Sequence, residues 1–322
     1  MNNFKKIGLT ALAGSLVATS VFAGELTASG AASMGIANIT GSADNGLGKN
    51  FTMGNSIYFA GGGELDNGLT VSVSFELDQG AANNSAGTPT ADTGAVFDSH
   101  HVEIGSDALG TLRFSGHGGS SAQGAMDTTA AGDLWNNTLG LTGGPAAAAS
   151  GNNSLFYTLP ALMDGLTVTA SLAPRVAAVT DTHMSYGVSY SGVEGLTLNY
   201  GTGESGVQTA VVDHTTMSAS YAIGPVTVSV SKTEIDKAGA TADIEWDSYQ
   251  VAYTLSENIS ATYGSETVDT VGTSVDEEVT GFGVSYTTGG MTISASQINA
   301  EGGSNVAAAD TDRWSLTAAF AF

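Results

Sequence analysis

The stretch GVSYSGVEGLTLNY, residues 187–200, decides the fold class of this chain. Apolar side chains alternate with Ser, Thr, Gly and Asn on both sides of the turn signal Glu194-Gly195. A period of two is typical of β-strands, whereas a helix repeats every 3.6 residues. The stretch therefore predicts two antiparallel strands joined by a tight turn, with one apolar face and one small, polar face.

The same layout recurs along the second half of the chain, in residues 218–230, 250–263 and 283–296. The tyrosines that precede the turns, Tyr190, Tyr221, Tyr253 and Tyr286, are spaced by 31, 32 and 33 residues, and Tyr157 lies 33 residues before the first. A fixed period indicates a repeated structural unit. A soluble sandwich also has one polar face, but Tyr beside each short turn matches the aromatic girdle of a transmembrane β-barrel.

Counting alternating runs predicts sixteen strands, an even number as in bacterial single-chain barrels. They lie near residues 25–39, 51–62, 69–78, 97–105, 111–117, 154–159, 166–173, 182–191, 196–203, 213–223, 226–235, 244–255, 259–268, 278–287, 291–299 and 311–322. A barrel of this size leaves an aqueous channel. The predicted fold is all-β: a transmembrane antiparallel β-barrel with its long third loop, residues 118–152, folded into the lumen.

The first 23 residues have the layout of a secretory signal peptide. Lys5 and Lys6 are followed by an apolar run, residues 7–18, and by the small-x-small site that ends at Ala23. The apolar run is shorter than the ~20 residues that a membrane-spanning helix needs. We therefore expect export, cleavage after Ala23 and a mature barrel of residues 24–322.

The charge of the chain favours cations as counter-species. Only 12% of its residues are charged, and the formal net charge is −23. Loss of Lys5 and Lys6 with the signal peptide lowers it to −25. Nucleic acid is excluded as a partner because its binding needs a basic surface.

Strand parity places several charged side chains on the inner face. His101 and Glu103 alternate with outward Val102 and Ile104, and Arg113 lies on the inner face of the next strand. Such charges are costly in a soluble core but are tolerated on the wall of a water-filled lumen. The loop of residues 118–152 is unusually long, which indicates a functional or a disordered segment.

Four features carry a family resemblance: the hairpin HVEIGSDALGTLRFSG at residues 101–116, the long loop after it, the repeated hairpins, and the alternating C-terminal strand that ends in Phe322. With them the chain resembles the general diffusion porins of Gram-negative outer membranes, especially the sixteen-stranded alphaproteobacterial type. The resemblance implies a homotrimer in the outer membrane and a passive, water-filled channel for small hydrophilic solutes and ions. It also implies that the first and last strands lie near the subunit interface, which agrees with the small outward residues Ala28, Gly30 and Ala32.

The resemblance further implies a constriction formed by acidic residues of residues 118–152 facing a basic wall. In this chain the basic wall is thin, because Arg113 stands beside Glu76, Asp78 and Glu103, and we therefore expect cation preference. The expected constriction residues are Glu76, His101, Glu103, Arg113, Asp127, Asp133 and Arg313. The expected membrane girdle is Tyr157, Tyr190, Tyr221, Tyr253, Tyr286, Trp314 and Phe320, and Phe322 is the expected outer-membrane assembly signal.

Metal sites have weaker support. Adjacent His100 and His101 point to opposite faces of a strand, and no ligand spacing completes a set. The acidic runs at residues 276–278 and at Asp310 with Asp312 offer the carboxylate oxygens that Ca²⁺ prefers. Ca²⁺ in these loops therefore stays open beside the simpler interpretation as solvated loop acids, and no other cofactor is expected.

The sequence also bears on two other functional classes, a serine hydrolase and a surface protein. A serine hydrolase is disfavoured because the chain has no G-x-S-x-G motif and no Ser, His and acid at a recognisable spacing, so we expect no enzyme. The alternative function is that of an exported structural or adhesive β-rich surface protein. Such a protein would leave the membrane fraction without detergent and would have no use for Tyr beside each short turn.

Overall fold

A computed structural model of the chain describes residues 25–44, 46, 48–78, 97–126, 129–132, 134, 137–142, 146–175, 181–207, 209–238 and 243–322. These residues form sixteen strands and three short 3-10 turns. The strands are β1 (Glu25–Gly41), β2 (Asn50–Glu64), β3 (Thr70–Asp78), β4 (Ser99–Ser106), β5 (Gly110–His117), β6 (Ser154–Thr158), β7 (Leu166–Ala173), β8 (His183–Val193), β9 (Leu196–Val207), β10 (Ala210–Ile223), β11 (Val226–Lys237), β12 (Ile244–Ser256), β13 (Ile259–Thr270), β14 (Glu277–Thr288), β15 (Met291–Glu301) and β16 (Thr311–Ala321). The turns are η1 (Gly124–Met126), η2 (Asn137–Leu139) and η3 (Gly303–Asn305).

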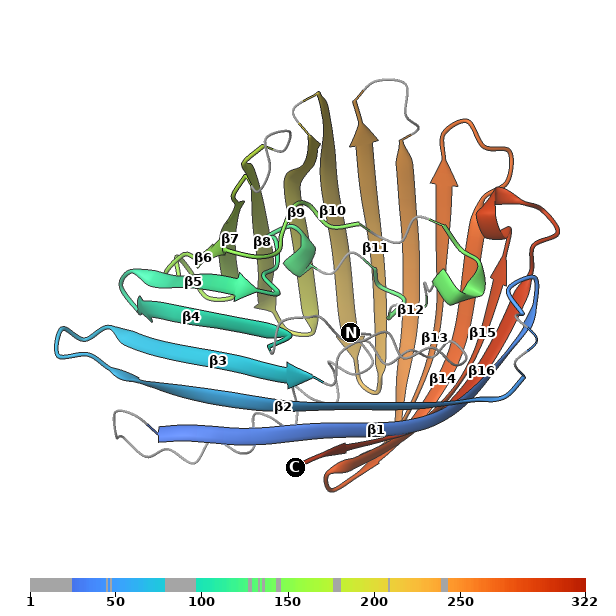
Figure 1. The fold of residues 1–322 in the computed structure, drawn as a ribbon, viewed down its shortest axis with the longest axis horizontal. Helices are drawn as coiled ribbons and strands as arrows, with labels where there is room; N and C mark the ends of the chain where they lie inside the picture. The colour runs from blue at the N-terminus through green and yellow to red at the C-terminus, as the bar shows by residue number, and fades with distance from the viewer. Residues whose placement is uncertain are drawn as a thin grey trace.

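Each strand pairs antiparallel with its neighbours in the sequence, and β1 also pairs with β16, so the sheet closes into a barrel (Figure 1). Closure pairs every strand on both sides and leaves no sheet edge, as a membrane-spanning sheet requires. The predicted fold class and the predicted sixteen strands are therefore confirmed. Within the described ranges, no helix is long and apolar enough to cross a membrane.

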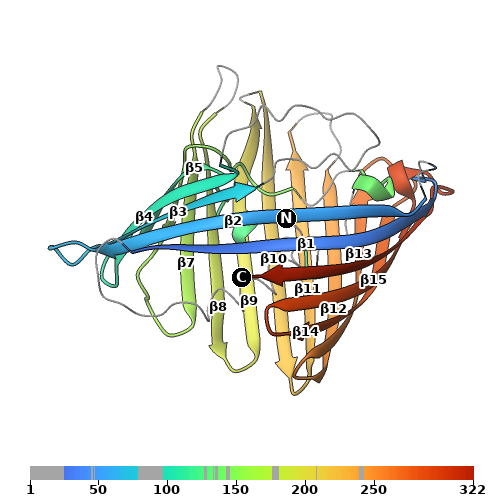
Figure 2. The same ribbon diagram turned by 60° about the horizontal axis from the view of Figure 1, so that its bottom comes forward.

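The last residue of the chain completes the closure. Phe322 lies beside β1 (Figure 2), where its backbone N–H donates to the carbonyl of Gly30 at 3.0 Å and its carbonyl accepts from Gly30 N–H at 2.6 Å. A Cβ on Gly30 would lie 2.4 Å from the Phe322 ring. The sequence predicted that Gly30 is small because it faces another protomer, whereas here its small size makes room for Phe322 of the same chain.

The apolar and polar side chains of the barrel are placed in the reverse of a soluble protein, with the apolar ones facing outward. On β8 the outward Tyr186 is 50% exposed, whereas the inward Ser185 is 1% exposed. The same contrast recurs on β12 and β14, where Tyr249 and Phe282 are exposed and Ser248 is buried. An apolar outer face over a small, polar inner face is the pattern of a barrel surrounded by lipid. It argues against the soluble β-rich surface protein that the sequence left open.

Strand register shows where the predicted girdle residues lie. Tyr190, Tyr221, Tyr253 and Tyr286 are outward residues near the short turns of their hairpins. The hydroxyl of Tyr157 donates to the carbonyl of Leu109 in such a turn, and Phe320 pairs with Met291 at the same end of the barrel. Trp314 pairs with Asn38 near the opposite end of β16. The girdle role itself stays a prediction.

The long segment between β5 and β6 turns into the barrel (Figure 1). We call residues 118–152 the constriction loop, after the role expected from the sequence, and that role stays a prediction. Gly119 and Gly151 form an isolated antiparallel bridge that holds the two ends of the loop together. Between these ends, η1 and η2 lie against the inner faces of strands β8 to β10 and of β16, respectively.

Candidate functional site

Pairs of inward serines on adjacent strands hold the backbone of the constriction loop. The pairs are Ser171 with Ser185 at 2.5 Å and Ser231 with Ser248 at 2.6 Å. Ala122 N–H donates to both hydroxyls of the first pair at 2.9 and 2.8 Å, and Ala130 N–H donates to both hydroxyls of the second at 2.9 and 2.6 Å. Buried backbone N–H groups need hydrogen-bond acceptors, and these serine hydroxyls supply acceptors for the backbone of the loop.

The fully buried side chain of Gln123 joins the two arms of the loop to the wall. Its amide nitrogen donates to the hydroxyl of Thr216 at 2.7 Å, and its amide oxygen accepts from Ala148 N–H at 2.7 Å. Because one side chain satisfies groups on both arms and on β10, its bonds fix this part of the loop in place.

Two buried carboxylates bind the loop further along its course, around residues 129–134 and at residue 142. Glu266 on β13, which is 0% exposed, accepts from the Thr129 hydroxyl at 2.6 Å and from Leu134 N–H at 3.2 Å. Glu277 on β14, which is 1% exposed, accepts from Thr142 N–H at 3.0 and 3.1 Å and from the Thr142 hydroxyl at 3.0 Å. Hydrogen bonds to a charged acceptor contribute roughly 1.5–3 kcal/mol each, so these carboxylates are strong anchors.

Inward glycines make space for the loop. A Cβ on Gly201 would lie 2.9 Å from Cα of Gln123, and a Cβ on Gly281 would lie 2.4 Å from the Leu134 side chain. A Cβ on Gly187 would lie 2.7 Å from the carbonyl oxygen of Ala122, and a Cβ on Gly264 would lie 3.1 Å from Ala131. On this side of the barrel, the Ser and Gly pattern of the sequence therefore forms a packing surface for the loop.

A small apolar core completes the contact. It consists of Ala131, Leu134, Leu139 and Leu141 from the loop and Val279, Ile298 and Ala300 from the inner faces of β14 and β15. These are inward apolar residues in a mainly polar lumen, and burying them against the loop stabilises its position by the hydrophobic effect.

The wall formed by β2 to β5 carries charged side chains. Arg113 on β5 donates from Nε and Nη2 to Oε2 of Glu103 on β4, each at 2.9 Å. The two residues are direct cross-strand partners, and their side chains are 46% and 30% exposed. Strand parity predicted that both residues face inward, and the structure adds that they form an ion pair on the lumen wall.

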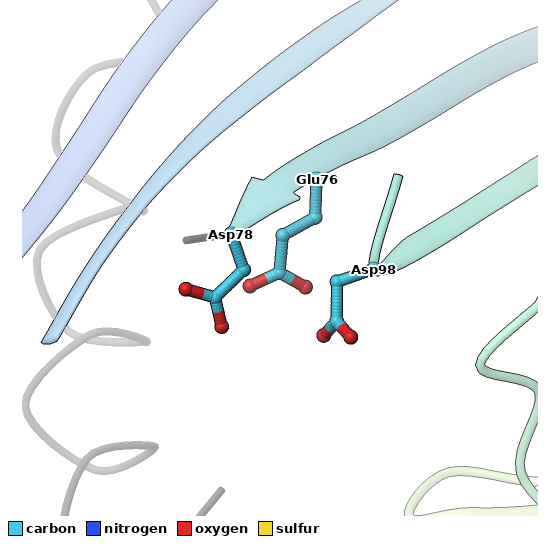
Figure 3. Close-up of side chains that lie close together, drawn as sticks. All are labelled: Glu76, Asp78 and Asp98. Carbon is cyan, nitrogen blue, oxygen red and sulfur yellow. The ribbon is translucent and has the colours of Figure 1, made fainter. Parts of the chain in front are cut away.

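A cluster of three carboxylates lies on the same wall (Figure 3). Oxygens of Glu76, Asp78 and Asp98 lie within 4.8 Å of one another. Glu76 is buried and accepts from the Tyr58 hydroxyl at 2.6 Å and from the Ser99 hydroxyl at 2.9 Å, whereas Asp78 and Asp98 are exposed. We call Glu76, Asp78 and Asp98 the acidic cluster.

The other predicted constriction residues do not gather in one place. His101 is inward, between Ser74 and Ser115 on the neighbouring strands. Arg313 is inward on β16, paired with Ile39, and β1 to β4 separate it from Arg113 in the ring of strands. Asp127 and Asp133 lie outside the described residues, so their role stays a prediction.

One interpretation of the sequence needs correction. Residues 276–278 were read as loop acids open to Ca²⁺, but Glu277 begins β14, points inward and is buried, with its oxygens engaged by Thr142 and Ser304. The strand starts one residue earlier than predicted, which moves Glu277 from the loop to the wall.

Sequence reasoning missed Glu266, Gln123 and Asp98. Alternation on β13 carried a signal for Glu266, because Tyr263 lies on the outer face and residue 266 has the opposite parity. No periodicity marks Gln123 in its Ala/Gly-rich loop or Asp98 before β4, so their contacts depended on the three-dimensional structure.

Comparison with protein families matches residues 8–267 to the Gram-negative porin family. The chain belongs to that family. The resemblance inferred from the sequence is therefore confirmed, and family and fold together indicate an outer-membrane diffusion channel rather than an enzyme. No curated protein sequence matches this porin.

Solved structures share the fold of this porin at low identity. An anion-selective porin from Comamonas acidovorans aligns with a TM-score of 0.70 and 13% identity over 93% of this chain and 100% of its own. OmpT, an outer membrane protein of Vibrio cholerae in a trimer form, aligns with a TM-score of 0.68 and 14% identity over 94% and 100%. A mutant of the Rh. blastica porin aligns with a TM-score of 0.65 and 15% identity over 92% and 100%. These likenesses carry the fold, and the ion selectivity of this chain has to be argued from its own residues.

Proposed function

We propose that this porin is a passive, cation-preferring channel for small hydrophilic solutes and ions. The observation that carries the proposal is the charge of the described wall opposite the anchored loop. Glu76, Asp78, Asp98 and Glu103 contribute four carboxylates, whereas Arg113 contributes one guanidinium that is already paired with Glu103. A ring of carboxylates at a narrow pore favours cations.

The constriction loop supports the same proposal in a different way. Several of its backbone donors are bound by inward serines and by Glu266 and Glu277, so these two buried carboxylates serve as anchors. The acidic cluster has two exposed members and lies on the wall away from these anchors. Permeating cations would therefore meet the acidic cluster. We propose that Asp127 and Asp133, as expected from the sequence, also contribute to the constriction.

The test is the reversal potential of refolded residues 24–322 in a planar bilayer under a KCl gradient. We expect stepwise conductance and a potential that favours K⁺. Anion preference would overturn the proposed selectivity while leaving a channel. The same measurement is made on the double variant Asp127→Asn with Asp133→Asn. An unchanged ion selectivity would show that these two residues do not contribute to the constriction.

We further propose a homotrimer, formed after export and cleavage at Ala23, with β1 and β2 at the subunit interface. Met34 and Met53 are cross-strand partners on the outer face, and both are strongly exposed in the single chain. Phe51, which lies on β2 with Met53, is 78% exposed. A continuous apolar surface of this kind would be covered by a second copy or by lipid.

Native mass spectrometry of the detergent-extracted protein tests the trimer and, from the mass of each chain, the cleavage site. We expect a mass of three mature chains, and monomers for Met34→Glu with Met53→Glu. A trimer that survives this double substitution would place the interface elsewhere, and a mass that includes residues 1–23 would contradict cleavage.

A further inference from the structure

Glu277 contacts two loops at once. Besides Thr142 of the constriction loop, its Oε1 accepts from the backbone N–H of Ser304 at 2.7 Å. Ser304 belongs to the connection between β15 and β16, residues 302–310, which we call the outer loop. A single buried carboxylate on the barrel wall therefore joins the outer loop to the constriction loop.

The two loops also touch directly. The Ser304 hydroxyl donates to the carbonyl of Gly140 at 3.3 Å, and a Cβ on Gly303 would lie 3.1 Å from the same carbonyl oxygen. Gly140 follows η2, whose Leu139 belongs to the apolar core described above. A displacement of the outer loop would therefore act on the segment of the constriction loop that this core holds.

The outer loop adopts an uncommon backbone to make these contacts. Gly302, Ser304 and Asn305 have φ values of 69°, 56° and 58°, in the left-handed region. This region disfavours residues other than glycine. It places Ser304 N–H against the Glu277 carboxylate, so the hydrogen bond offsets a backbone conformation that Ser304 would otherwise avoid.

The opposite side of the outer loop is open. Val306 is 53% exposed, and Ala307 and Ala308 are exposed beside it. The loop is also tied to the connection after β1, because Ser42 N–H donates to the carbonyl of Asp310 at 2.7 Å. An exposed tip on a tethered base is suited to receive a contact at the pore mouth and to transmit it to Glu277.

We propose that Glu277 couples the outer loop to the constriction loop, so that a change at the exposed tip of the outer loop alters conduction at the constriction. Glu277 is a positioning residue in this scheme, since it acts through Thr142 and Ser304. The proposal rests on the channel function proposed above. Glu266 on the neighbouring strand β13 provides the contrast, because its hydrogen bonds to Thr129 and Leu134 hold the constriction loop.

The test uses the absence of cysteine from the sequence. In Val306→Cys, a bulky, charged maleimide reacts at one place, the tip of the outer loop. The matched control is Thr209→Cys, at the exposed tip between β9 and β10. Single-channel conductance and reversal potential are recorded before and after labelling, in three backgrounds: unchanged, Glu277→Gln and Glu266→Gln.

We expect the label at position 306 to change conductance with Glu277 present and to have little effect with Glu277→Gln. Loss of one charge-assisted hydrogen bond shifts the equilibrium between the bound and the released position of the constriction loop by roughly tenfold or more. With Glu266→Gln the label should still act, and the label at position 209 should do nothing in any background.

Two outcomes would overturn the coupling. One is an equal effect of the label with Glu277 and with Glu277→Gln, which would mean that the label obstructs the pore directly. The other is no effect of the label in the unchanged background. If Glu277→Gln does not fold, Thr142→Val keeps the carboxylate, removes one donor and should weaken the response to the label. Anion preference of the unlabelled protein would contradict the proposed selectivity alone, because coupling is read from the change in conductance.

Discussion

The inner wall of the barrel has two regions that look alike in sequence and differ in what they contact. From β7 to β14, hydroxyls, glycines and carboxylates are covered by the constriction loop. From β2 to β5, the acidic cluster and the pair Glu103–Arg113 face the lumen. The comparison shows that inward polar side chains of similar type either bind the loop or stay open to the lumen, depending on the strand that carries them.

The largest effect is expected from breaking the covered region. Gly281→Val would place a side chain where Leu134 lies, because even a Cβ there is 2.4 Å from it. Overpacking of this kind costs about 1–3 kcal/mol, and it should lower the urea midpoint of unfolding and displace the loop. Thr280→Val on the outer face of the same strand is the control. If both variants unfold alike, the loop does not pack on this wall as described.

The next effect concerns the open region. Replacing Glu76, Asp78 and Asp98 by Gln, Asn and Asn should reduce the ratio of K⁺ to Cl⁻ permeability roughly three- to tenfold, since three charges act on ions at short range through screened water. Measurement of the reversal potential under a KCl gradient at 0.1 M and at 1 M salt tests this. The effect should shrink at high salt, and an effect independent of salt would contradict an electrostatic origin.

A smaller effect is expected from one member of a serine pair. Ser248→Ala removes one of two acceptors of Ala130 N–H and leaves Ser231 in place. The cost should be about 0.5–1.5 kcal/mol, measured by urea unfolding. Ser285→Ala is the matched control, because Ser285 is paired with Ser260 and has no described bond to the loop. Equal costs would mean that the serine pairs stabilise the barrel and not the loop.

The smallest change in stability is expected from Glu103→Gln. Its ion pair with Arg113 is half-exposed, and exposed pairs contribute about 0–1 kcal/mol. Release of the Arg113 charge should nevertheless shift the reversal potential towards anions. Glu103→Gln is therefore expected to change the ion selectivity while leaving the free energy of unfolding almost unchanged. A large loss of stability without a shift in potential would assign the pair to scaffolding.

The sequence predicted the barrel well because alternation and turn chemistry act locally. Residues 187–200 specify a hairpin by themselves, and parity correctly placed Glu103 and Arg113 on the lumen wall. Even the inner placement of Glu266 follows from parity on β13. The groups that an inward side chain contacts also depend on the neighbouring strands. Those contacts follow from the strand pairing of the whole barrel and cannot be read from one local stretch.

The partners of the inward residues could not be predicted in this way. Thr142 and Glu277 are 135 residues apart, and the Ala/Gly/Ser-rich loop between β5 and β6 carries no periodicity that would align it with a wall. Glu277 was also assigned to a loop because its strand starts one residue before the expected boundary. Element ends are where local pattern is weakest.

The contact between Gly30 and Phe322 has a consequence for the order of assembly. Every other strand meets its neighbours in sequence, so hairpins can form one after another, but β1 receives its second partner only from the last strand. Until β16 is present, the sheet has two unpaired edges, and each is a site for pairing with another chain. The ring can therefore close only after β16 has been synthesised, and the edge of β1 must be kept from pairing with other chains until then.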